Sequence, residues 1–402
     1  MKAVIKPSKA EGSIMAPPSK SMAHRYMICA ALAMGESIVN NISYSQDILA
    51  TIDCISALGA EVIKEPERLI IRGRGISAKG PLTLACRECG STLRFMVPIA
   101  MMRGEDTLLT GSETLMTRPM SVYEDLAKVQ GLIYEKSEDG ILVNGRLGAG
   151  IYEVPGNISS QFISGLMFVL PLLNEKSEIC LIPPVDSRSY IDLTIKALLK
   201  FGVDVKWKDE TTLEILGRQT YSPTEVTIEG DYSNAAFLEV FNTLDGQVTV
   251  NGLDSDSRQG DRVYYEYFSR LIGGRSTLDI SDCPDLGPVL FVVAATHYGG
   301  TFTGTRRLAI KESNRGKVMC EELAKFGIES TFEEDCITIE GGEPVAPEGV
   351  VHGYNDHRIV MAMVTMLSIT GGSVDDAMAV NKSFPDYYER IKKIGIDVEL
   401  TE

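Results

Sequence analysis

Residues 16–33 read APPSKSMAHRYMICAALA. The run from residue 26 to residue 33 is apolar on every side, which predicts a buried helix rather than a helix with one solvent-facing side. The two prolines end any preceding helix, and Ser19 or Ser21 is suited to cap the new one. This stretch therefore predicts a helix that enters a core almost at once.

The same pattern, a polar opening followed by a more apolar helix, recurs along the chain. It opens at six positions: Ser19, Gly90, Ser159, Tyr232, Pro284 and Asn355. The intervals between them are 71, 69, 73, 52 and 71 residues. A second pattern, a helix that ends in an apolar pair and a glycine before strand-like residues, recurs in step. Its glycines are Gly59, Gly131, Gly202, Gly273, Gly327 and Gly395, at intervals of 72, 71, 71, 54 and 68 residues.

These two periodicities predict an α/β protein of six related units, each with a buried helix, a more exposed helix and short strands. Each glycine is expected to end its helix in a left-handed conformation. Three units per half predict two similar domains, joined near residues 217–230. We assign residues 14–227 to the first domain and residues 1–13 with 228–402 to the second. Ligands are expected in the cleft between them.

Charge and composition exclude several classes of partner. The chain has 402 residues and a formal net charge of −16, which argues against nucleic acid or an anionic membrane surface as a partner. No apolar stretch is long enough to span a bilayer, and the start lacks the apolar segment of a signal peptide. We expect a cytoplasmic protein, and no feature indicates an obligate partner, so we expect a monomer.

Cysteine and histidine usage predicts that no metal and no cofactor is bound. The eight cysteines of a chain without a secretion signal are expected to be free thiols. Cys86 and Cys89 form one C-x-x-C pair, but no second pair follows at the spacing of a zinc site. Only four histidines are present.

The polar openings carry an unusual set of side chains. A helix N-terminus favours acidic residues, yet cations stand at several of these openings. Taken singly, each is most simply a solvated charge or a cap. If the buried helices of a domain run side by side, these groups share one end and form a site for phosphate or carboxylate anions. The residues are Lys20, Ser21, Arg25, Gly90, Ser91, Arg94, Ser159, Ser160, Gln161, Asp285, Asp356, His357 and Arg358.

Seven motifs identify a family resemblance. In order from Lys20 to Tyr388, the motifs are PPSKSMAHR, CGSTLR, the Arg118-Pro119 step, NISSQF, IKESNR, YNDHR and KSFPDYY. Together they resemble the 5-enolpyruvylshikimate-3-phosphate synthase family. The resemblance implies two domains, each of three βαβαββ repeats, that close on substrate. It implies transfer of the carboxyvinyl group of phosphoenolpyruvate to the 5-hydroxyl of shikimate 3-phosphate, with release of phosphate. Such a reaction needs an acid and a base but no metal or covalent nucleophile.

The resemblance also implies the roles of individual residues. Shikimate 3-phosphate is expected to contact Lys20, Ser21, Arg25, Ser159, Ser160, Gln161, Ser187, Tyr190, Asp285, Arg307 and Lys311. Phosphoenolpyruvate is expected to contact Lys20, Gly90, Arg118, Gln161, Arg315, Arg358 and Lys382. The expected catalytic residues are Lys20, Asp285 as the base on the attacking hydroxyl, and Glu312 as the acid that protonates the methylene carbon.

Three positions depart from the family pattern. Glu88 places an acid beside Gly90, near the expected anion site. Phe95 follows Arg94 where a proline is common, and Arg307 stands where an asparagine often contacts the shikimate phosphate.

Three alternative functions are less consistent with the sequence. The sister transferase that acts on UDP-N-acetylglucosamine uses a loop cysteine, and the matching stretch here, GSETLMTRPM, contains none. A non-catalytic anion-binding relative is expected to lose carboxylates and arginines that this chain retains. An RNA-end-processing enzyme of related build is disfavoured by the net charge of −16.

Overall fold

Helix α1 (Lys20–Leu32) is the buried helix predicted from the opening stretch. In the computed structural model, which describes residues 1–402, eleven of its 13 residues are buried. Ser19 Oγ accepts a hydrogen bond from Met22 N at 3.4 Å, so Ser19 rather than Ser21 caps the helix. No acidic residue lies in the first turn.

The chain forms two units that interleave in sequence. The N-terminal unit comprises Pro18–Glu229, and the C-terminal unit comprises Met1–Pro17 together with Gly230–Glu402. Each unit has its own hydrophobic core. The first 17 residues therefore belong with the end of the chain rather than with the helix that follows them.

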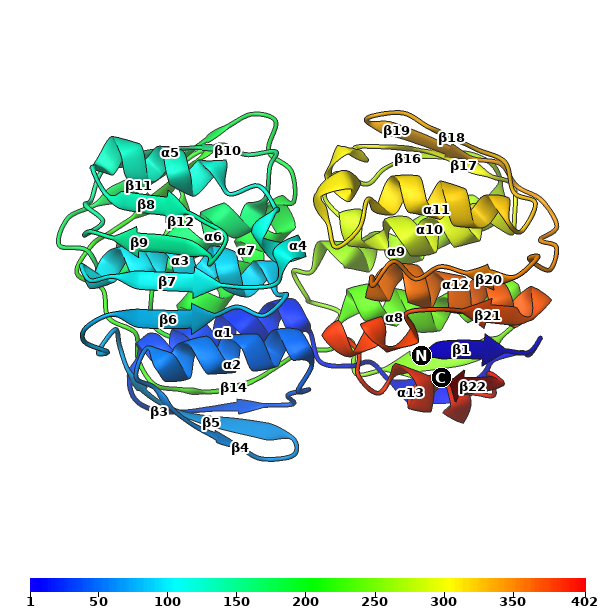
Figure 1. Ribbon diagram of the computed structural model, residues 1–402, viewed down its shortest axis with the longest axis horizontal. Coiled ribbons are helices and arrows are strands. Elements are labelled where there is room, and N and C mark those ends of the chain that lie inside the picture. The colour runs from blue at the N-terminus through cyan, green and yellow to red at the C-terminus, as the bar shows by residue number, and fades with distance from the viewer. The chain divides into compact units, whose positions relative to one another are not determined.

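The second repeat of the N-terminal unit shows the βαβαββ pattern in full (Figure 1). Its elements are β6 (Leu82–Ala85), α3 (Gly90–Arg103), β7 (Thr107–Thr110), the short α4 (Glu113–Met116), α5 (Ser121–Gln130), β8 (Ile133–Lys136) and β9 (Ile141–Asn144). The strand order is β6-β7-β9-β8, in which only β6 and β7 are parallel. The buried helix α3 thus forms the crossover between two parallel strands.

The first and third repeats of this unit have the same strand pattern. The first contains α1, β3 (Met34–Asn40), α2 (Gln46–Ala57), β4 (Glu61–Lys64), β5 (Arg68–Arg74) and β14 (Glu225–Thr227). The third contains β10 (Ile151–Pro155), α6 (Ser160–Val169), η1 (Leu170–Leu172), β11 (Ser177–Ile182), α7 (Arg188–Lys200), β12 (Val205–Trp207) and β13 (Thr212–Ile215). Strand β14 reaches back to pair in parallel with β3, which closes the unit.

Two repeats of the C-terminal unit are complete. The first contains β16 (Ser276–Asp279), η4 (Pro284–Leu286), α10 (Gly287–Ala295), β17 (Gly300–Thr303), η5 (Arg306–Ile310), α11 (Arg315–Ala324), β18 (Ser330–Phe332) and β19 (Cys336–Ile339). The other contains β20 (Val350–Val351), α12 (His357–Thr370), β21 (Gly372–Val374), η6 (Ala377–Lys382), α13 (Tyr387–Lys393), β22 (Val398–Thr401) and β1 (Lys2–Ile5). Strand β1 lies between β21 and β22, so both termini end in one sheet (Figure 1).

The remaining repeat is shorter, and its length explains the two short intervals in the sequence. It contains β2 (Glu11–Met15), α8 (Tyr232–Glu239), η2 (Val240–Leu244), β15 (Gln247–Asn251), η3 (Gly260–Val263) and α9 (Tyr264–Gly273). Its sheet has only β15 and β2, so the last two strands of the pattern are missing. Gly273 is the last residue of α9 and does not have a positive φ, so the predicted left-handed cap is wrong there, whereas the other five glycines have positive φ.

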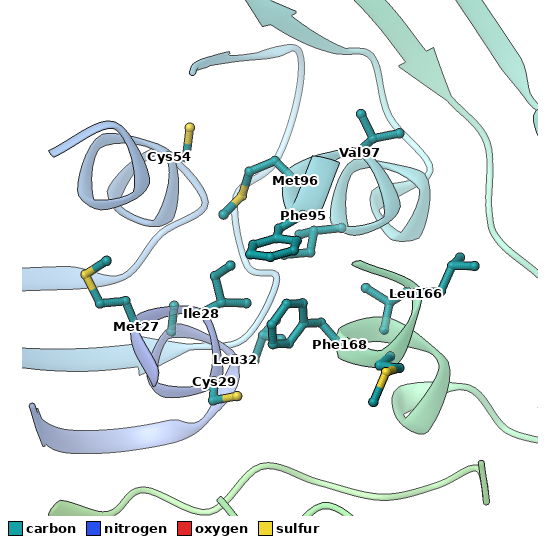
Figure 2. Packing of buried hydrophobic residues seen from close by; sticks show 14 of the residues in the cluster. Met27, Ile28, Cys29, Leu32, Cys54, Phe95, Met96, Val97, Leu166 and Phe168 are labelled. Carbon is teal, nitrogen blue, oxygen red and sulfur yellow. The ribbon is translucent and has the colours of Figure 1, made fainter. Parts of the chain in front are cut away.

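Buried helices form the centre of each unit. In the N-terminal unit, α1, α3 and α6 pack through apolar side chains such as Ile28, Phe95 and Leu166 (Figure 2). The rings of Phe95 and Phe168 meet edge to face with centroids 5.3 Å apart. Although such helices are apolar all round, none combines the length and apolar character needed to cross a membrane.

Candidate active site

Lys20 begins α1, and its side chain turns to the start of the neighbouring helix α2. Its Nζ donates to Asp47 Oδ2 at 2.6 Å, and the two side chains are 17% and 11% exposed. Ser45 caps α2, which places Asp47 in the first turn, where the helix dipole stabilises a carboxylate. This ion pair fixes the Lys20 ammonium at the N-terminal end of two helices.

Arg25, one turn further along α1, is a buried cation held by neutral groups. Nε donates to Thr194 Oγ1 at 2.8 Å, Nη1 to Ser21 O at 2.7 Å, and Nη2 to Tyr190 O at 3.1 Å. Burial lowers the pKa of Arg25 to about 10. A buried charge without a carboxylate partner is costly, so this arrangement fits a residue whose counter-ion is a ligand.

Phe95, which departs from the family pattern, contacts the Arg25 side chain. The guanidinium carbon of Arg25 lies 5.4 Å from the centroid of the Phe95 ring. An aromatic face attracts a cation, so Phe95 supports the charged side chain from beneath while it packs in the core.

Gln161 joins the starts of α3 and α6. Its Oε1 accepts from Arg94 Nη1 at 2.7 Å, and its Nε2 donates to Ser91 Oγ at 2.8 Å. Ser159 caps α6 through a 3.3 Å bond from Gln161 N, and Ser160 is buried beside it. The predicted polar openings of these two helices therefore meet at one end, as the sequence analysis expected.

Gly90, the first residue of α3, lies against Arg118. A Cβ at this position would be 2.6 Å from Arg118 Nη1 and 3.6 Å from Arg94 Nη1. Arg118 follows α4, which Ser112 caps. Glycine thus lets the Arg118 guanidinium approach the helix start, where the exposed N–H groups favour an anion.

Ser187 and Tyr190 lie at the start of α7. Ser187 is buried and has a φ of 54°, a left-handed conformation that is uncommon outside glycine. Tyr190 N donates to Ser187 O at 3.1 Å, and Tyr190 O receives the Arg25 bond described above. All the expected residues of the N-terminal unit are thus found at the ends of α1, α3, α6 and α7 or on the loop before α5.

The C-terminal unit contains a second cluster, centred on Arg315 at the start of α11. This side chain is 1% exposed. Nη1 donates to Asp285 Oδ1 at 2.8 Å, Nη2 to Glu312 Oε2 at 2.6 Å, and Nε to Asp356 Oδ2 at 2.8 Å. Burial lowers the pKa of Arg315, but the carboxylates outweigh it and raise that pKa above its usual value. Arg315 therefore stays charged and holds the carboxyl groups of Asp285, Glu312 and Asp356 around it.

Asp285, in η4, is surrounded by cations. Besides Arg315, its carboxylate lies 3.1 Å from Lys311 Nζ and 3.4 Å from Arg358 Nη2. Burial raises the pKa of Asp285, but Arg358, Lys311 and Arg315 together hold it well below its usual range. Asp285 is therefore ionised.

The charge of Lys311 changes near neutral pH. Burial, together with the nearby cations Arg307 and Arg315, lowers the pKa of Lys311 to about 8, although Asp285 and Glu312 act in the opposite direction. The ammonium is thus the main form at neutral pH.

Arg358 carries unsatisfied donors. Its backbone N donates to Asp356 Oδ1 at 3.0 Å, and its guanidinium lies 5.8 Å from the centroid of the Phe237 ring. Its Nε and Nη1 are buried without a hydrogen-bond partner. An unmade hydrogen bond at a buried donor costs about 1–3 kcal/mol, which fits a guanidinium that receives an anion.

Two further expected residues lie at the edges of this cluster. Lys382, the last residue of η6, donates from Nζ to Asn355 O at 2.7 Å. Asn355 and the preceding Tyr354 have φ values of 50° and 51°, so a tight turn leads into α12. Arg307 in η5 is buried, with Nη1 3.4 Å from Ser281 O.

The sequence analysis missed two carboxylates. Asp356 was noted only as part of a polar opening, yet it binds Arg315, accepts from Ser313 Oγ at 3.0 Å and caps α12. Asp47 was not singled out, because an acidic residue in the first turn of a helix is ordinary. The signal at Asp356 was its place directly before a buried helix.

One group of side chains in the N-terminal unit has the chemistry of a metal site, which the sequence analysis did not expect. Ligand atoms of His24, Asp47 and Cys89 all lie within 4.8 Å of one another, and the three residues are buried. Cys86, the other half of the C-x-x-C pair, is not among them; its sulfur lies 3.7 Å from Leu84 O.

Comparison with known proteins decides the family. Residues 4–391 match the sequence profile of EPSP synthase (3-phosphoshikimate 1-carboxyvinyltransferase). The chain belongs to the EPSP synthase family. A 3-phosphoshikimate 1-carboxyvinyltransferase from Clostridium kluyveri is 39% identical over an alignment of 418 positions, gaps included. The alignment covers 98% of this chain and 97% of that protein. One from Clostridium perfringens is 38% identical over 98% of both chains. The resemblance inferred from the seven motifs is thus confirmed.

Solved structures confirm the fold class. An EPSP synthase from Acinetobacter baumannii aligns with a TM-score of 0.82 at 23% identity and covers 100% of both chains. The enolpyruvyl transferase NikO from Streptomyces tendae aligns with a TM-score of 0.81 at 13% identity, over 100% of this chain and 98% of that one. At these identities the likeness concerns the fold, and it agrees with the predicted architecture of repeated sheet and helix units.

Proposed function

We propose that this chain is a 3-phosphoshikimate 1-carboxyvinyltransferase. It transfers the carboxyvinyl group of phosphoenolpyruvate to the 5-hydroxyl of shikimate 3-phosphate and releases phosphate, within the shikimate pathway of aromatic amino acid biosynthesis. The membership in the EPSP synthase family supports the reaction. The observation that carries the chemistry is the ionised Asp285 carboxylate, held among Lys311, Arg315 and Arg358.

In the first step, the 5-hydroxyl attacks C2 of phosphoenolpyruvate. Asp285 takes the hydroxyl proton, and Glu312 delivers a proton to C3, so the two carboxyl groups act as base and acid. In the second step, Glu312 takes a proton back from C3 and the proton on Asp285 leaves with phosphate, which restores the double bond and returns both carboxyl groups to their starting forms. The atoms balance without a further reactant, and Arg315 contacts both carboxylates at 2.8 and 2.6 Å.

The N-terminal unit supplies most of the proposed contacts with shikimate 3-phosphate, and the C-terminal unit supplies the rest. Arg25 brings the buried positive charge, and Ser159, Ser160 and Gln161 bring donors at the start of α6, where the helix dipole favours an anion. Lys20 contributes an ammonium between the two ligands. The further groups proposed to contact this substrate are Ser21, Ser187, Tyr190, Asp285, Arg307 and Lys311.

Guanidinium groups dominate the proposed site for phosphoenolpyruvate. Arg118 and Arg358 suit a small ligand that carries both a phosphate and a carboxylate, because a guanidinium binds either group through two parallel hydrogen bonds. Arg315 is also proposed to contact this ligand, for which it must give up one of its bonds to Asp285, Glu312 or Asp356. Gly90, Gln161, Lys20 and Lys382 complete the set. We propose that both units act on one pair of substrates. We also propose that the protein is cytoplasmic and monomeric, as expected from its sequence.

Acceptor-dependent phosphate release tests this function. The enzyme is mixed with phosphoenolpyruvate and a chelator, and either shikimate 3-phosphate or UDP-N-acetylglucosamine is added. Release only with shikimate 3-phosphate is the expected result. Release only with the nucleotide sugar would assign the chain to the sister activity, and no release with either acceptor from folded protein would favour a non-catalytic relative.

A further inference from the structure

His24, Asp47 and Cys89 come from three helix starts of the N-terminal unit. His24 lies in the first two turns of α1, Asp47 lies in the first turn of α2, and Cys89 caps α3 by accepting from Thr92 N. Cys89 Sγ lies 3.9 Å from His24 Nε2. The cluster is buried, and the Asp47 side chain and its partner Lys20 keep only 11% and 17% of their surface exposed.

Hydrogen bonds orient the imidazole as they do in metal sites. His24 Nδ1 lies 2.7 Å from Thr51 Oγ1, which in turn lies 2.7 Å from Thr92 Oγ1. Burial, reinforced by Lys20 and Arg25, holds the pKa of His24 well below its ordinary value. The imidazole is therefore neutral, and a proton on Nδ1, shared with Thr51, leaves the Nε2 lone pair directed at Cys89.

The spacing is close to that of a tetrahedral site. Zinc–sulfur and zinc–nitrogen bonds of about 2.3 and 2.0 Å put the two ligand atoms about 3.5 Å apart, against the 3.9 Å between Cys89 and His24. The carboxylate is within 4.8 Å of both, so a shift of roughly 1 Å by a side chain in the first turn of α2 completes the set.

We propose that His24, Asp47 and Cys89 form a binding site for Zn²⁺ or a similar borderline-soft divalent metal. Thiolate, imidazole and carboxylate are the ligands that such metals select, whereas Mg²⁺ prefers six oxygens. On binding, the metal replaces the thiol proton, which passes to the buffer, and bonds form from the metal to Sγ, Nε2 and a carboxylate oxygen. Because the thiol must lose its proton to bind the metal, metal binding is expected to strengthen with pH.

A metal ion bound at this site competes with Lys20 for the Asp47 carboxylate. Asp47 Oδ2 now accepts from Lys20 Nζ at 2.6 Å, and metal coordination withdraws that oxygen and places a divalent charge beside the ammonium. The metal is therefore an inhibitor rather than a cofactor. This consequence rests on the proposed function, because it requires Lys20 to contact substrate; the binding itself does not.

Cobalt absorption tests the binding without reference to activity. Co²⁺ added to the chelator-treated full chain should give one tetrahedral site, seen as an intense thiolate-to-cobalt band that saturates at one equivalent and is removed by Zn²⁺. The variant Cys89→Ser should lose this band, because a hydroxyl caps α3 equally well but binds the metal poorly. Cys86→Ser, the other cysteine of the C-x-x-C pair, should keep it.

Each alternative outcome overturns the proposal. Absence of the band in the unaltered protein would show that no thiolate site forms, and a band that persists in Cys89→Ser would place the metal on another cysteine. If Cys89→Ser does not fold, as judged by its melting temperature, Cys89→Ala and His24→Gln provide the same comparison.

Phosphate release then tests the inhibition. Zn²⁺ should inhibit reversibly, a chelator should restore the rate, and Mg²⁺ should have no effect. Cys89→Ser should keep the basal rate, and its inhibition should require a Zn²⁺ concentration at least about tenfold higher. Loss of a group that only supports a metal ligand already lowers metal affinity by about tenfold or more, so loss of a ligand should lower it at least as much. Zinc binding without inhibition would keep the site but overturn the competition with Lys20.

Discussion

Arg315 and Asp356 form a fully buried ion pair with two hydrogen bonds, from Nε to Oδ2 at 2.8 Å and from Nη2 to Oδ1 at 3.2 Å. Asp356 also accepts from Arg358 N at the start of α12. One carboxylate therefore fixes both a helix start and the guanidinium that holds Asp285 and Glu312. Because removal of one partner leaves a buried charge uncompensated, this pair is expected to matter for stability as well as for activity.

Asp356→Ala should lower the free energy of unfolding by about 3–5 kcal/mol, because it removes both the counter-charge and the cap. Asp356→Asn should cost less, since an asparagine keeps the cap of α12, but its kcat/KM should fall because Arg315 loses its anchor. Urea unfolding and steady-state kinetics check both variants. Equal stability of the alanine and asparagine variants would contradict the capping role.

Glu312→Gln should slow the chemical step more than binding. The amide retains a hydrogen bond to Arg315 Nη2 but carries no proton for C3, so kcat should fall by roughly 10²- to 10⁴-fold, with KM changed little. The measurement is the kcat–KM split for phosphoenolpyruvate. A change in KM alone would make Glu312 a binding residue and place the acid elsewhere.

Lys311 predicts a pH dependence for the binding of shikimate 3-phosphate. Its pKa of about 8 means that the ammonium is lost as the pH rises through that value, so KM should rise roughly tenfold between pH 7 and pH 9. The substrate phosphate is already a dianion over this range. Lys311→Arg stays charged and should give a flat profile; the same rise in that variant would assign the titration to another group.

Gly90→Ala should weaken binding of phosphoenolpyruvate selectively. The new methyl group would lie 2.6 Å from Arg118 Nη1, a distance that forces the guanidinium to move. KM for phosphoenolpyruvate should rise severalfold, while KM for shikimate 3-phosphate and the melting temperature change little. Gly273→Ala, where the added Cβ meets no atom within 4 Å, is the matched control. Unchanged kinetics in Gly90→Ala would show that Arg118 relaxes without cost.

The repeats could be predicted from sequence because they rest on local properties. A helix with no polar face, such as α1 or α10, must be buried wherever it lies, and its recurrence at fixed intervals needs no tertiary information. Cations at helix starts, such as Lys20 and Arg25, stand out because they oppose the dipole. The EPSP synthase resemblance rested on motifs of the same local kind.

Pairings between distant residues could not be predicted in this way. Asp47 is 27 residues from Lys20, Asp356 is 41 from Arg315, and Cys89 is 65 from His24. Such contacts depend on which helix starts the fold brings together, and a single sequence does not encode them in any periodicity. The C-x-x-C pair was interpreted as no metal site because no second pair follows it, and that spacing gives no sign that Cys89 lies 3.9 Å from the His24 imidazole.

Identification of the product tests the central claim most directly. The protein is incubated with phosphoenolpyruvate and shikimate 3-phosphate, and the mixture is followed by phosphorus and proton NMR. We predict inorganic phosphate in equal amount to a new enol ether, with two vinyl protons and its oxygen on C5 of the shikimate ring. Recovery of unchanged shikimate 3-phosphate from active, folded protein, or a carboxyvinyl group on another oxygen, would contradict the account.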